Sequence, residues 1–311
     1  MPNTLIIGSG SYVPENVIDG SHFADAVFYD DNNQLIEKPT EEIIQKFVDI
    51  TEIEHRRYAN PEDFNSDLAH RASLEAIEDA GIDKEEIDYI IFATNFGEVD
   101  VNGIPNFMPS MSARLKGKLG IKRRDCINYD MIFGCPGWVE SLILADTMIK
   151  AGKAKTVLVV GGETLSRVTD PYDRNKMIFA DGAGAVVVTA TEDSTVGVLA
   201  DNTLCDNGEE LCYLENGPSL NLEHDQSQLF IRMRGRKIYE YALKNVPDAI
   251  KATIDKAGLD ISDISKILIH QANAKMDYAM IGRLFKLYGQ KDYDHAISPM
   301  TIQELGNSSV A

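Results

Sequence analysis

The sequence has little positive charge, few cysteines and no long apolar run, and each shortage narrows the range of functions. Thirty lysines and arginines stand against 49 aspartates and glutamates, which gives a net charge of −19. Such an acidic chain is a poor match for nucleic acid or an anionic membrane as its main partner. No stretch approaches the roughly 18 apolar residues of a membrane-spanning helix. The opening segment MPNTLIIGSG also lacks the basic start and long apolar run of a signal peptide.

Cysteine usage indicates a reducing compartment. The chain has only four cysteines, and none lies in the CxxC spacing of a structural zinc site; they are Cys126, Cys135, Cys205 and Cys212. We therefore expect free thiols and a cytoplasmic location. The histidines form no metal-binding pattern, so we expect no metal.

Strand and helix signals alternate along the chain, which predicts a layered α/β fold. With 311 residues, 44% of them hydrophobic, the chain is long enough for about two domains. The main expected strands lie near residues 4–7, 87–95, 127–134, 156–162, 183–190 and 264–270. Helices are expected near 66–80, 139–151 and 274–289, and over 236–258 with a kink or break at Pro247.

The same helix–linker–strand pattern occurs twice, as DAGIDKEEIDYIIFATN and KAGLDISDISKILIHQAN. In each, a helix ends at Ala-Gly and a short acidic linker leads into an apolar strand. The pattern predicts two similar halves, residues 1–194 and 195–311. Chance recurrence of common helix–strand punctuation is the alternative.

Cys135 stands between an expected strand and an expected helix, in the segment GCPGW. Pro136 suits the first position of a helix because its fixed φ is already helical. Cys135 would then lie at the N-cap, where the positive end of the helix dipole lowers a thiol pKa. The alternative is a buried, inert cysteine, which is the interpretation we keep for the other three.

Two further segments supply a base and an amide. His270 follows an apolar run in IHQAN, and Asn307 lies in ELGNSS. Alone, the histidine could be structural and the asparagine a turn residue. Together, Cys135, His270 and Asn307 are the residue types of an acyltransferase that needs no cofactor. A papain-type hydrolase uses the same types in the same order, but GCPGW lacks its cysteine signature.

Beyond these three sites, the sequence resembles the β-ketoacyl-acyl-carrier-protein synthase III family of the thiolase superfamily. The shared segments run in order along nearly the whole chain: IGSGSYVPENVI, TEIEHRRYA, SDLAHRASLEAIEDAGI, IDYIIFATN, GCPGW, VVGGETLSR, DPYDR, FADGAGAVVV, LIHQAN and LGNSS. The resemblance implies a five-layer αβαβα fold of two duplicated halves and a homodimer. It also implies the decarboxylative condensation of an acyl thioester primer with malonyl-acyl carrier protein.

The resemblance also implies roles for individual residues. Cys135 matches the acyl-accepting nucleophile, and His270 and Asn307 match the pair that binds the malonyl thioester. Among substrate-binding positions, Asn273 matches an asparagine beside the pantetheine arm. Arg174 matches a basic residue at the coenzyme A entrance, and Met108 lies where a partner subunit reaches the acyl pocket.

The prediction of a carrier-protein partner depends on basic clusters within this acidic chain. The family docks its carrier protein near the start of a long helix. Four basic residues lie just before or at the start of that helix in this sequence, so we expect carrier binding there; they are Arg232, Arg234, Arg236 and Lys237. A second cluster around KGKLGIKRR is as easily a solvated face. The segment KFVDITEI has Lys46 and Ile50 where coenzyme A-primed relatives place Trp and Arg. The primer can therefore arrive on coenzyme A or on a carrier protein.

The family pattern continues past the Asn307 motif with a helix and two strands, so we expect the C-terminal end of the fold to be truncated at Ala311. Three alternatives remain at this point: simple acyl transfer, a specialised lipid or polyketide condensation, and a non-catalytic partner subunit.

Overall fold

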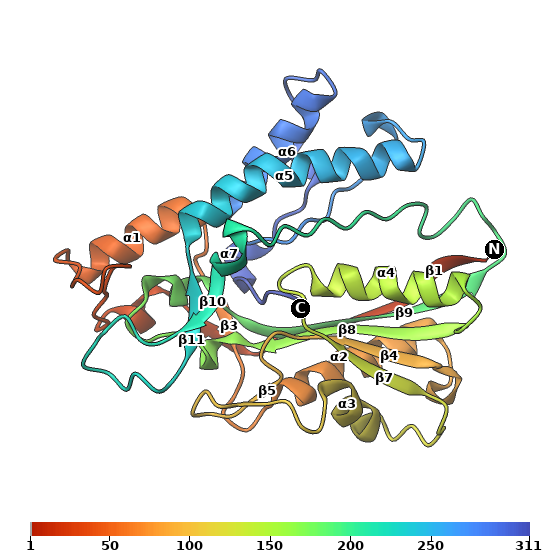
Figure 1. The fold of residues 1–311 in the computed structure, drawn as a ribbon, viewed down its shortest axis with the longest axis horizontal. Helices are drawn as coiled ribbons and strands as arrows, with labels where there is room; N and C mark the ends of the chain where they lie inside the picture. Colours follow the sequence, from red (N-terminus) through yellow and green to blue (C-terminus); the bar gives the residue numbers. More distant parts are fainter. Residues whose placement is uncertain (1) are drawn as a thin grey trace.

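The computed structural model describes residues 2–311 and is built on one five-stranded sheet (Figure 1). The parallel strands β8, β4 and β7 lie side by side, and β9 and β1 extend the sheet in antiparallel fashion. Across the sheet the order is β1 (Asn3–Tyr12), β9 (Asp181–Thr191), β8 (Thr156–Thr164), β4 (Tyr89–Ala93) and β7 (Ile127–Met131). Every residue of β8 is buried, as expected for a central strand covered on both faces.

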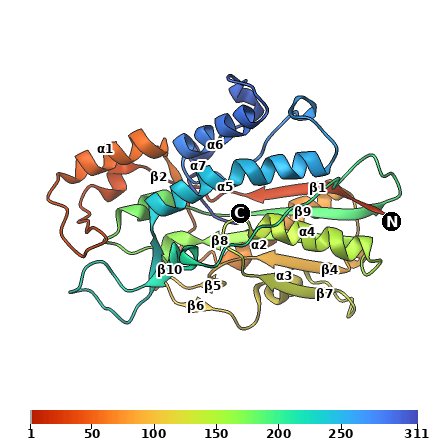
Figure 2. The same cartoon turned by 45° about the horizontal axis from the view of Figure 1, so that its top comes forward.

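Helices cover both faces of the sheet (Figures 1 and 2). On one face lie α2 (Asn65–Ala80) and α3 (Met111–Leu119); on the other lies α4 (Gly137–Lys150). Helix α2 buries Leu68, Ala69, Ala72 and Ala76, spaced for one helical face. These residues pack with β4, β8 and β9 side chains in the largest hydrophobic core.

The remaining elements lie around this layered body. Figure 1 shows α5 (Gly235–Lys256) and α6 (Ala274–Leu287) above α4, and α1 (Thr40–Thr51) at one end. The short helix α7 (Ile302–Leu305) precedes Asn307. Three small antiparallel pairs complete the fold: β2 (Asn16–Ile18) with β3 (Arg56–Tyr58), β5 (Glu98–Val99) with β6 (Pro105–Asn106), and β10 (Leu214–Gly217) with β11 (Phe230–Met233).

Most predicted elements of the first half are confirmed. Helix α5 is also confirmed and runs through Pro247 from Gly235 to Lys256, so a break at Pro247 is excluded and a kink there stays a prediction. The predicted strand at 264–270 is wrong, because within this segment only the N–H groups of Ile264 and Ile267 have backbone partners, the carbonyls of Ile261 and Ile297. Without a covering layer in the described residues, Leu268 is 79% exposed. Among residues 2–311 no helix is long and apolar enough to cross a membrane.

Candidate active site

Cys135 lies where the carboxyl ends of three parallel strands meet. It follows β7, and β4 and β8 end at the same edge of the sheet. That edge is where open α/β sheets present functional groups. A tight turn, with Gly134 at φ +75° and the N–H of Gly137 donating to the Gly134 carbonyl, leads into α4. Because of this turn the N-cap is Pro136, so Cys135 lies one residue further from the helix than the sequence indicates.

The loop of Asn307 reaches this edge through backbone pairing. The Asn307 N–H donates to the Ile178 carbonyl at 3.0 Å, and the Ala180 N–H donates to the Asn307 carbonyl at 2.8 Å. The loop then crosses β8 at Gly161, where an added Cβ would lie 1.9 Å from the Val310 carbonyl oxygen. Only glycine therefore allows the loop to approach the sheet so closely. In Figure 1 the end of the chain lies beside the start of α4.

Ser309 contacts all three residues that the sequence singled out. Its hydroxyl lies 3.5 Å from the sulfur of Cys135, and its N–H donates to Asn307 Oδ1 at 2.8 Å. His270 forms a hydrogen bond with the Ser309 backbone and another with the Cys135 sulfur. Since Oδ1 of Asn307 accepts from a backbone N–H, the amide NH2 of Asn307 is the part that remains for a ligand.

Cys135 and His270 each change the pKa of the other. Burial opposes ionisation of the thiol, but the charge of His270 and hydrogen bonds from His270 and Ser309 lower the pKa of Cys135 to about 7. Desolvation acts to lower the pKa of His270, although the residue is exposed at the surface of the chain. The charge and hydrogen bond of Cys135, the charge of Asp277 and a hydrogen bond to the Ser309 backbone together outweigh desolvation and raise the pKa of His270. The pair therefore favours thiolate and imidazolium.

Two buried carboxyl groups stand behind this pair. Burial raises the pKa of Asp277 to about 7, against the opposing charge of His270 and a hydrogen bond from the Asn273 backbone. Burial likewise raises the pKa of Glu163 to about 8. Its carboxyl accepts hydrogen bonds from the N–H of Asn95 and from the Thr94 hydroxyl.

Comparisons with known proteins agree with this geometry. A family model described as 3-oxoacyl-(acyl-carrier-protein) synthase III matches residues 129–207, the span that contains Cys135. A β-ketoacyl-acyl-carrier-protein synthase III from Erythrobacter litoralis is 36% identical over 280 residues, covering 89% of this chain and 79% of the relative. Its counterpart from Clostridium perfringens is 34% identical over 289 residues, covering 91% and 82%. The chain belongs to the β-ketoacyl-acyl-carrier-protein synthase III family.

Solved structures of this synthase family share the fold. The 3-oxoacyl-acyl-carrier-protein synthase III from Aquifex aeolicus VF5 superposes with a TM-score of 0.79 at 30% identity, over 99% of this chain and 87% of that one. The priming β-ketosynthase of the R1128 polyketide pathway has the same TM-score at 25% identity, over 98% and 83%. The predicted thiolase-type α/β fold and the family are thus confirmed, and the chain is a condensing enzyme of the acyltransferase class.

The other residues predicted for the synthase site are more scattered. Asn273 is the N-cap of α6, and its side chain accepts from the Met276 N–H at 3.1 Å. Arg174 is exposed at the start of the short 3-10 helix η4 (Arg174–Ile178). Arg232 and Arg234 line a cavity of about 440 Å³ beside the β10–β11 pair. Arg232 donates to the Pro218 carbonyl at 2.7 Å, and Arg234 lies 3.6 Å from Glu215.

Arg236 and Lys237 are exposed in the first turn of α5. Arg236 pairs with Glu240 one helical turn further on, at 2.9 Å. Exposed pairs of this kind are weak and open readily toward another anion. The basic cluster therefore remains a surface that an acidic partner can reach.

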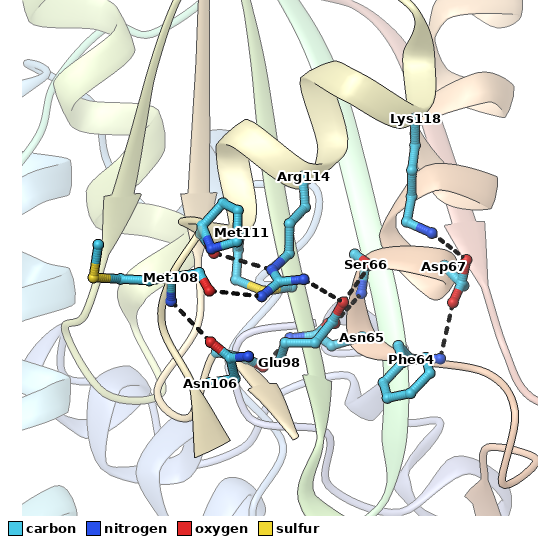
Figure 3. Close-up of polar contacts among 12 residues, drawn as sticks. Phe64, Asn65, Ser66, Asp67, Glu98, Asn106, Met108, Met111, Arg114 and Lys118 are labelled. Carbon is cyan, nitrogen blue, oxygen red and sulfur yellow. Dashed lines mark hydrogen bonds and ion pairs between the residues drawn. The ribbon is translucent and has the colours of Figure 1, made fainter. Parts of the chain in front are cut away.

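Met108 is 84% exposed, in the segment between β6 and α3. Figure 3 shows how Arg114 of α3 holds this segment in place. Its guanidinium donates to the carbonyls of Met108 at 3.2 Å and Pro109 at 3.0 Å, and it lies 3.7 Å from Glu98. Glu98 in turn accepts from Ser66 of α2 at 2.6 and 2.9 Å. The exposed methionine is thus carried by a segment fixed to two helices.

One cluster of possible metal ligands occurs among the described residues, formed by Glu54, His55 and Glu304. His55 Nδ1 lies 3.0 Å from a Glu304 oxygen, and this contact accounts for the grouping.

Sequence reasoning missed Ser309, Asn95, Glu163 and Asp277. The sequence held a signal for the first three: Asn95 lies two residues after an apolar strand, Glu163 lies near the end of another, and Ser309 follows Asn307 by two residues. Polar residues at the carboxyl ends of parallel strands gather at one edge, as Cys135 does. Asp277 has no such signal, because it falls inside an ordinary amphipathic helix.

Proposed function

We propose that this chain condenses an acyl thioester primer with malonyl-acyl carrier protein, with loss of carbon dioxide, to give a β-ketoacyl product. In this proposal Cys135 is the nucleophile, and His270 and Asn307 bind the thioester carbonyl of the malonyl group. The proposal is supported most by one observation. The three residues come from separate parts of the chain and converge on Ser309.

The first step transfers the acyl group to the enzyme. The Cys135 thiolate attacks the thioester carbonyl, a new carbon–sulfur bond forms, and the carbon–sulfur bond to the carrier breaks. His270, positively charged beside the thiolate, supplies the proton that the departing carrier thiol needs. A thiol pKa of about 7 keeps a large share of Cys135 ionised near neutral pH.

Acylation changes the charge of His270. Once the sulfur is part of a thioester it carries no negative charge, so the main cause that raises the His270 pKa is gone. Desolvation then favours neutral imidazole. Neutral His270 and the Asn307 amide can donate hydrogen bonds to the malonyl carbonyl without protonating the carbanion that forms.

The second step makes the carbon–carbon bond. The bond between the malonyl carbon and its carboxylate breaks, carbon dioxide leaves, and the electron pair is held as an enolate stabilised by the two donors. The enolate carbon attacks the acyl carbonyl on Cys135. The carbon–sulfur bond to Cys135 breaks, and the thiolate is restored as the β-ketoacyl carrier departs.

Docking of the carrier is proposed at the basic cluster of Arg232, Arg234, Arg236 and Lys237. Against a net charge of −19, a local positive surface at the start of α5 is suited to an acidic carrier. Reversing charge with Arg234→Glu and Arg236→Glu should raise the KM for malonyl carrier severalfold while sparing acylation by small thioesters. Unchanged kinetics would remove the docking site from the proposal.

Substrate contacts by Asn273, Arg174 and Met108 belong to the same proposal. Asn273 uses its oxygen to cap α6, which leaves its NH2 for the pantetheine arm. Exposed Arg174 can pair with a phosphate of the carrier arm. Met108 would enter the acyl pocket of a second subunit. We also infer a reducing compartment such as the cytoplasm, since all four cysteines of the described chain are free thiols.

The test is intact mass after mixing the protein with acyl thioesters on coenzyme A and on carrier protein. A mass gain that Cys135→Ala abolishes would establish the acyl-enzyme, and the donor that gives it would identify the primer carrier. Adding malonyl carrier should then discharge the adduct and release carbon dioxide. An adduct that water alone discharges would favour a hydrolase, and no adduct from any donor would favour a non-catalytic partner subunit.

A further inference from the structure

Asn95 touches both loops that meet at the nucleophile. It directly follows Thr94 at the carboxyl end of β4 and is half-buried. Its side-chain oxygen accepts from the N–H of Gly134, the residue before Cys135, at 3.0 Å. Its NH2 lies 3.1 Å from the hydroxyl oxygen of Ser309 on the opposite loop. A single amide therefore bridges the Cys135 loop and the Asn307 loop.

The direction of each hydrogen bond in this bridge is fixed by chemistry. The N–H of Gly134 can only donate, so the amide oxygen of Asn95 must face it. The amide NH2 then faces Ser309, and since NH2 can only donate, the Ser309 oxygen must accept. A serine hydroxyl has one proton, and the sulfur of Cys135 lies 3.5 Å away as its acceptor.

We propose that Asn95 is a positioning residue that orients the Ser309 hydroxyl so that it donates a hydrogen bond to the sulfur of Cys135. This inference rests on the proposed function, in which Cys135 is the nucleophile. Asn95 itself does not touch the sulfur in this arrangement. Its NH2 donates to the Ser309 oxygen, so that the hydroxyl proton points away from Asn95 and toward the sulfur of Cys135.

The backbone of Asn95 is held as firmly as its side chain. Its N–H donates to Glu163, which is fully buried in β8 and also accepts from Thr94. The Thr94 hydroxyl in turn accepts from the N–H of Gly97 at 3.1 Å. These hydrogen bonds fix the backbone of Asn95. A residue that orients another group must itself be held in place.

The arrangement acts at two points of the reaction. Before acylation, the Ser309 O–H stabilises the attacking thiolate. After the carbon–carbon bond forms, the carbon–sulfur bond to Cys135 breaks and its electron pair returns to the sulfur. The same O–H then donates a hydrogen bond to the departing thiolate, and the proton stays on Ser309 throughout.

The experiment measures the rate of alkylation of Cys135 by iodoacetamide from pH 5.5 to 9.5, followed by peptide mass spectrometry. This readout needs neither substrate nor turnover. Two variants remove the bridge differently: Ser309→Ala deletes the hydroxyl, and Asn95→Asp replaces the donating NH2 with an accepting oxygen. Ser308→Ala is the matched control, because the Ser308 hydroxyl donates to the Ala311 carbonyl at 3.3 Å instead.

We expect both bridge variants to shift the alkylation profile upward by about one pH unit, so that alkylation at pH 7 slows about fivefold. At pH 9.5 the rates should converge with that of the unchanged protein, and Ser308→Ala should follow the unchanged profile throughout. Circular dichroism shows whether each bridge variant is folded. If one of the two is unfolded, the alkylation profile of the other decides the result.

The experiment distinguishes a failure of the proposed nucleophile from a failure of the Asn95 bridge. If Cys135 of the unchanged protein reacts no faster at pH 7 than the exposed Cys205 and Cys212, the proposed nucleophile fails. If Cys135 reacts fast but folded Ser309→Ala or Asn95→Asp keeps the same pH profile, the bridge is overturned while the proposed function stands.

Discussion

Cys135 and Glu163 are two potential negative charges near the same site, and the charge of the Cys135 sulfur makes the ionisation of Glu163 harder. The hydrogen bonds that Cys135 receives from His270 and Ser309 favour charge on the sulfur. Glu163 receives its hydrogen bonds from Asn95 and Thr94, and burial nevertheless dominates and raises its pKa to about 8. At neutral pH the carboxyl is therefore mostly protonated, which leaves the negative charge to the nucleophile.

The raised pKa of Glu163 predicts a pH-dependent effect on stability. In the unfolded chain this carboxyl has its ordinary pKa of 4.5, and in the folded chain about 8. Between these values the unfolded state binds fewer protons, so the free energy of unfolding falls as pH rises from about 4.5 to 8. Glu163→Gln removes this loss. The stability gained by the variant should be near zero at pH 4.5 and grow to at most about 5 kcal/mol above pH 8.

Urea unfolding at a series of pH values measures this difference directly, and subtraction of the two curves cancels the other buried carboxyls. The exposed Glu62→Gln is the control and should change little at any pH. A stability difference for Glu163→Gln that does not vary between pH 5 and pH 8.5 would contradict the raised pKa.

Among the elements, those whose partners are near in sequence could be predicted, and those that depend on distant chain could not. The buried strands β4 and β8 are continuous apolar runs, and α2 ends at Gly81 with φ +64°. The sequence therefore predicted both strands and the end of this helix. The run at 264–270 reads just as strongly as a strand. Strand formation needs a hydrogen-bonded neighbour, and composition alone does not supply one. The predicted division into halves 1–194 and 195–311 stays a prediction.

Some residues of the site could be predicted from the sequence and others could not. Cys135, His270 and Asn307 could be predicted because each carries distinctive chemistry in a recognisable segment. The bridge of Asn95 and Ser309 was not, because its meaning comes from which group donates to which, and that depends on three loops meeting in space.

At the level of elements, the close contact between β8 and the Asn307 loop predicts a strong effect of one methyl group. Gly161→Ala would place a Cβ 1.9 Å from the Val310 carbonyl oxygen, so the loop must move outward. A shift of about 1 Å in a catalytic group can lower kcat/KM about 100-fold. Single-turnover condensation with a fixed primer measures the loss.

Gly117→Ala is the matched control, since Gly117 lies inside α3 with open space around its Cα. Replacing a helical glycine by alanine should raise stability by about 0.5–1 kcal/mol and leave turnover unchanged. Full activity of Gly161→Ala would show that the loop does not need its present position for catalysis.

The two edges of the sheet differ in a way that bears on the whole molecule. Along β1, the chain around residues 196–198 covers part of the edge, with the Val198 N–H donating to the Thr4 carbonyl. The other edge, β7, exposes a series of apolar side chains that continues into the next loop and the β5–β6 region: Ile127, Tyr129, Ile132, Phe133, Val101, Ile104, Phe107 and Met108. An open apolar edge of this kind is a pairing surface.

We therefore predict a homodimer in which β7 of one subunit pairs with β7 of the other, which would also bring Met108 to the partner. Light scattering should give twice the 34.4 kDa of one chain. Lysine at both Tyr129 and Ile132 puts charge on the edge and should yield monomers that also lose condensation. Ile6→Lys places the same charge on the exposed face of β1 and should remain dimeric. Dimers that survive the double change on β7, or that dissociate with Ile6→Lys, would place the interface elsewhere.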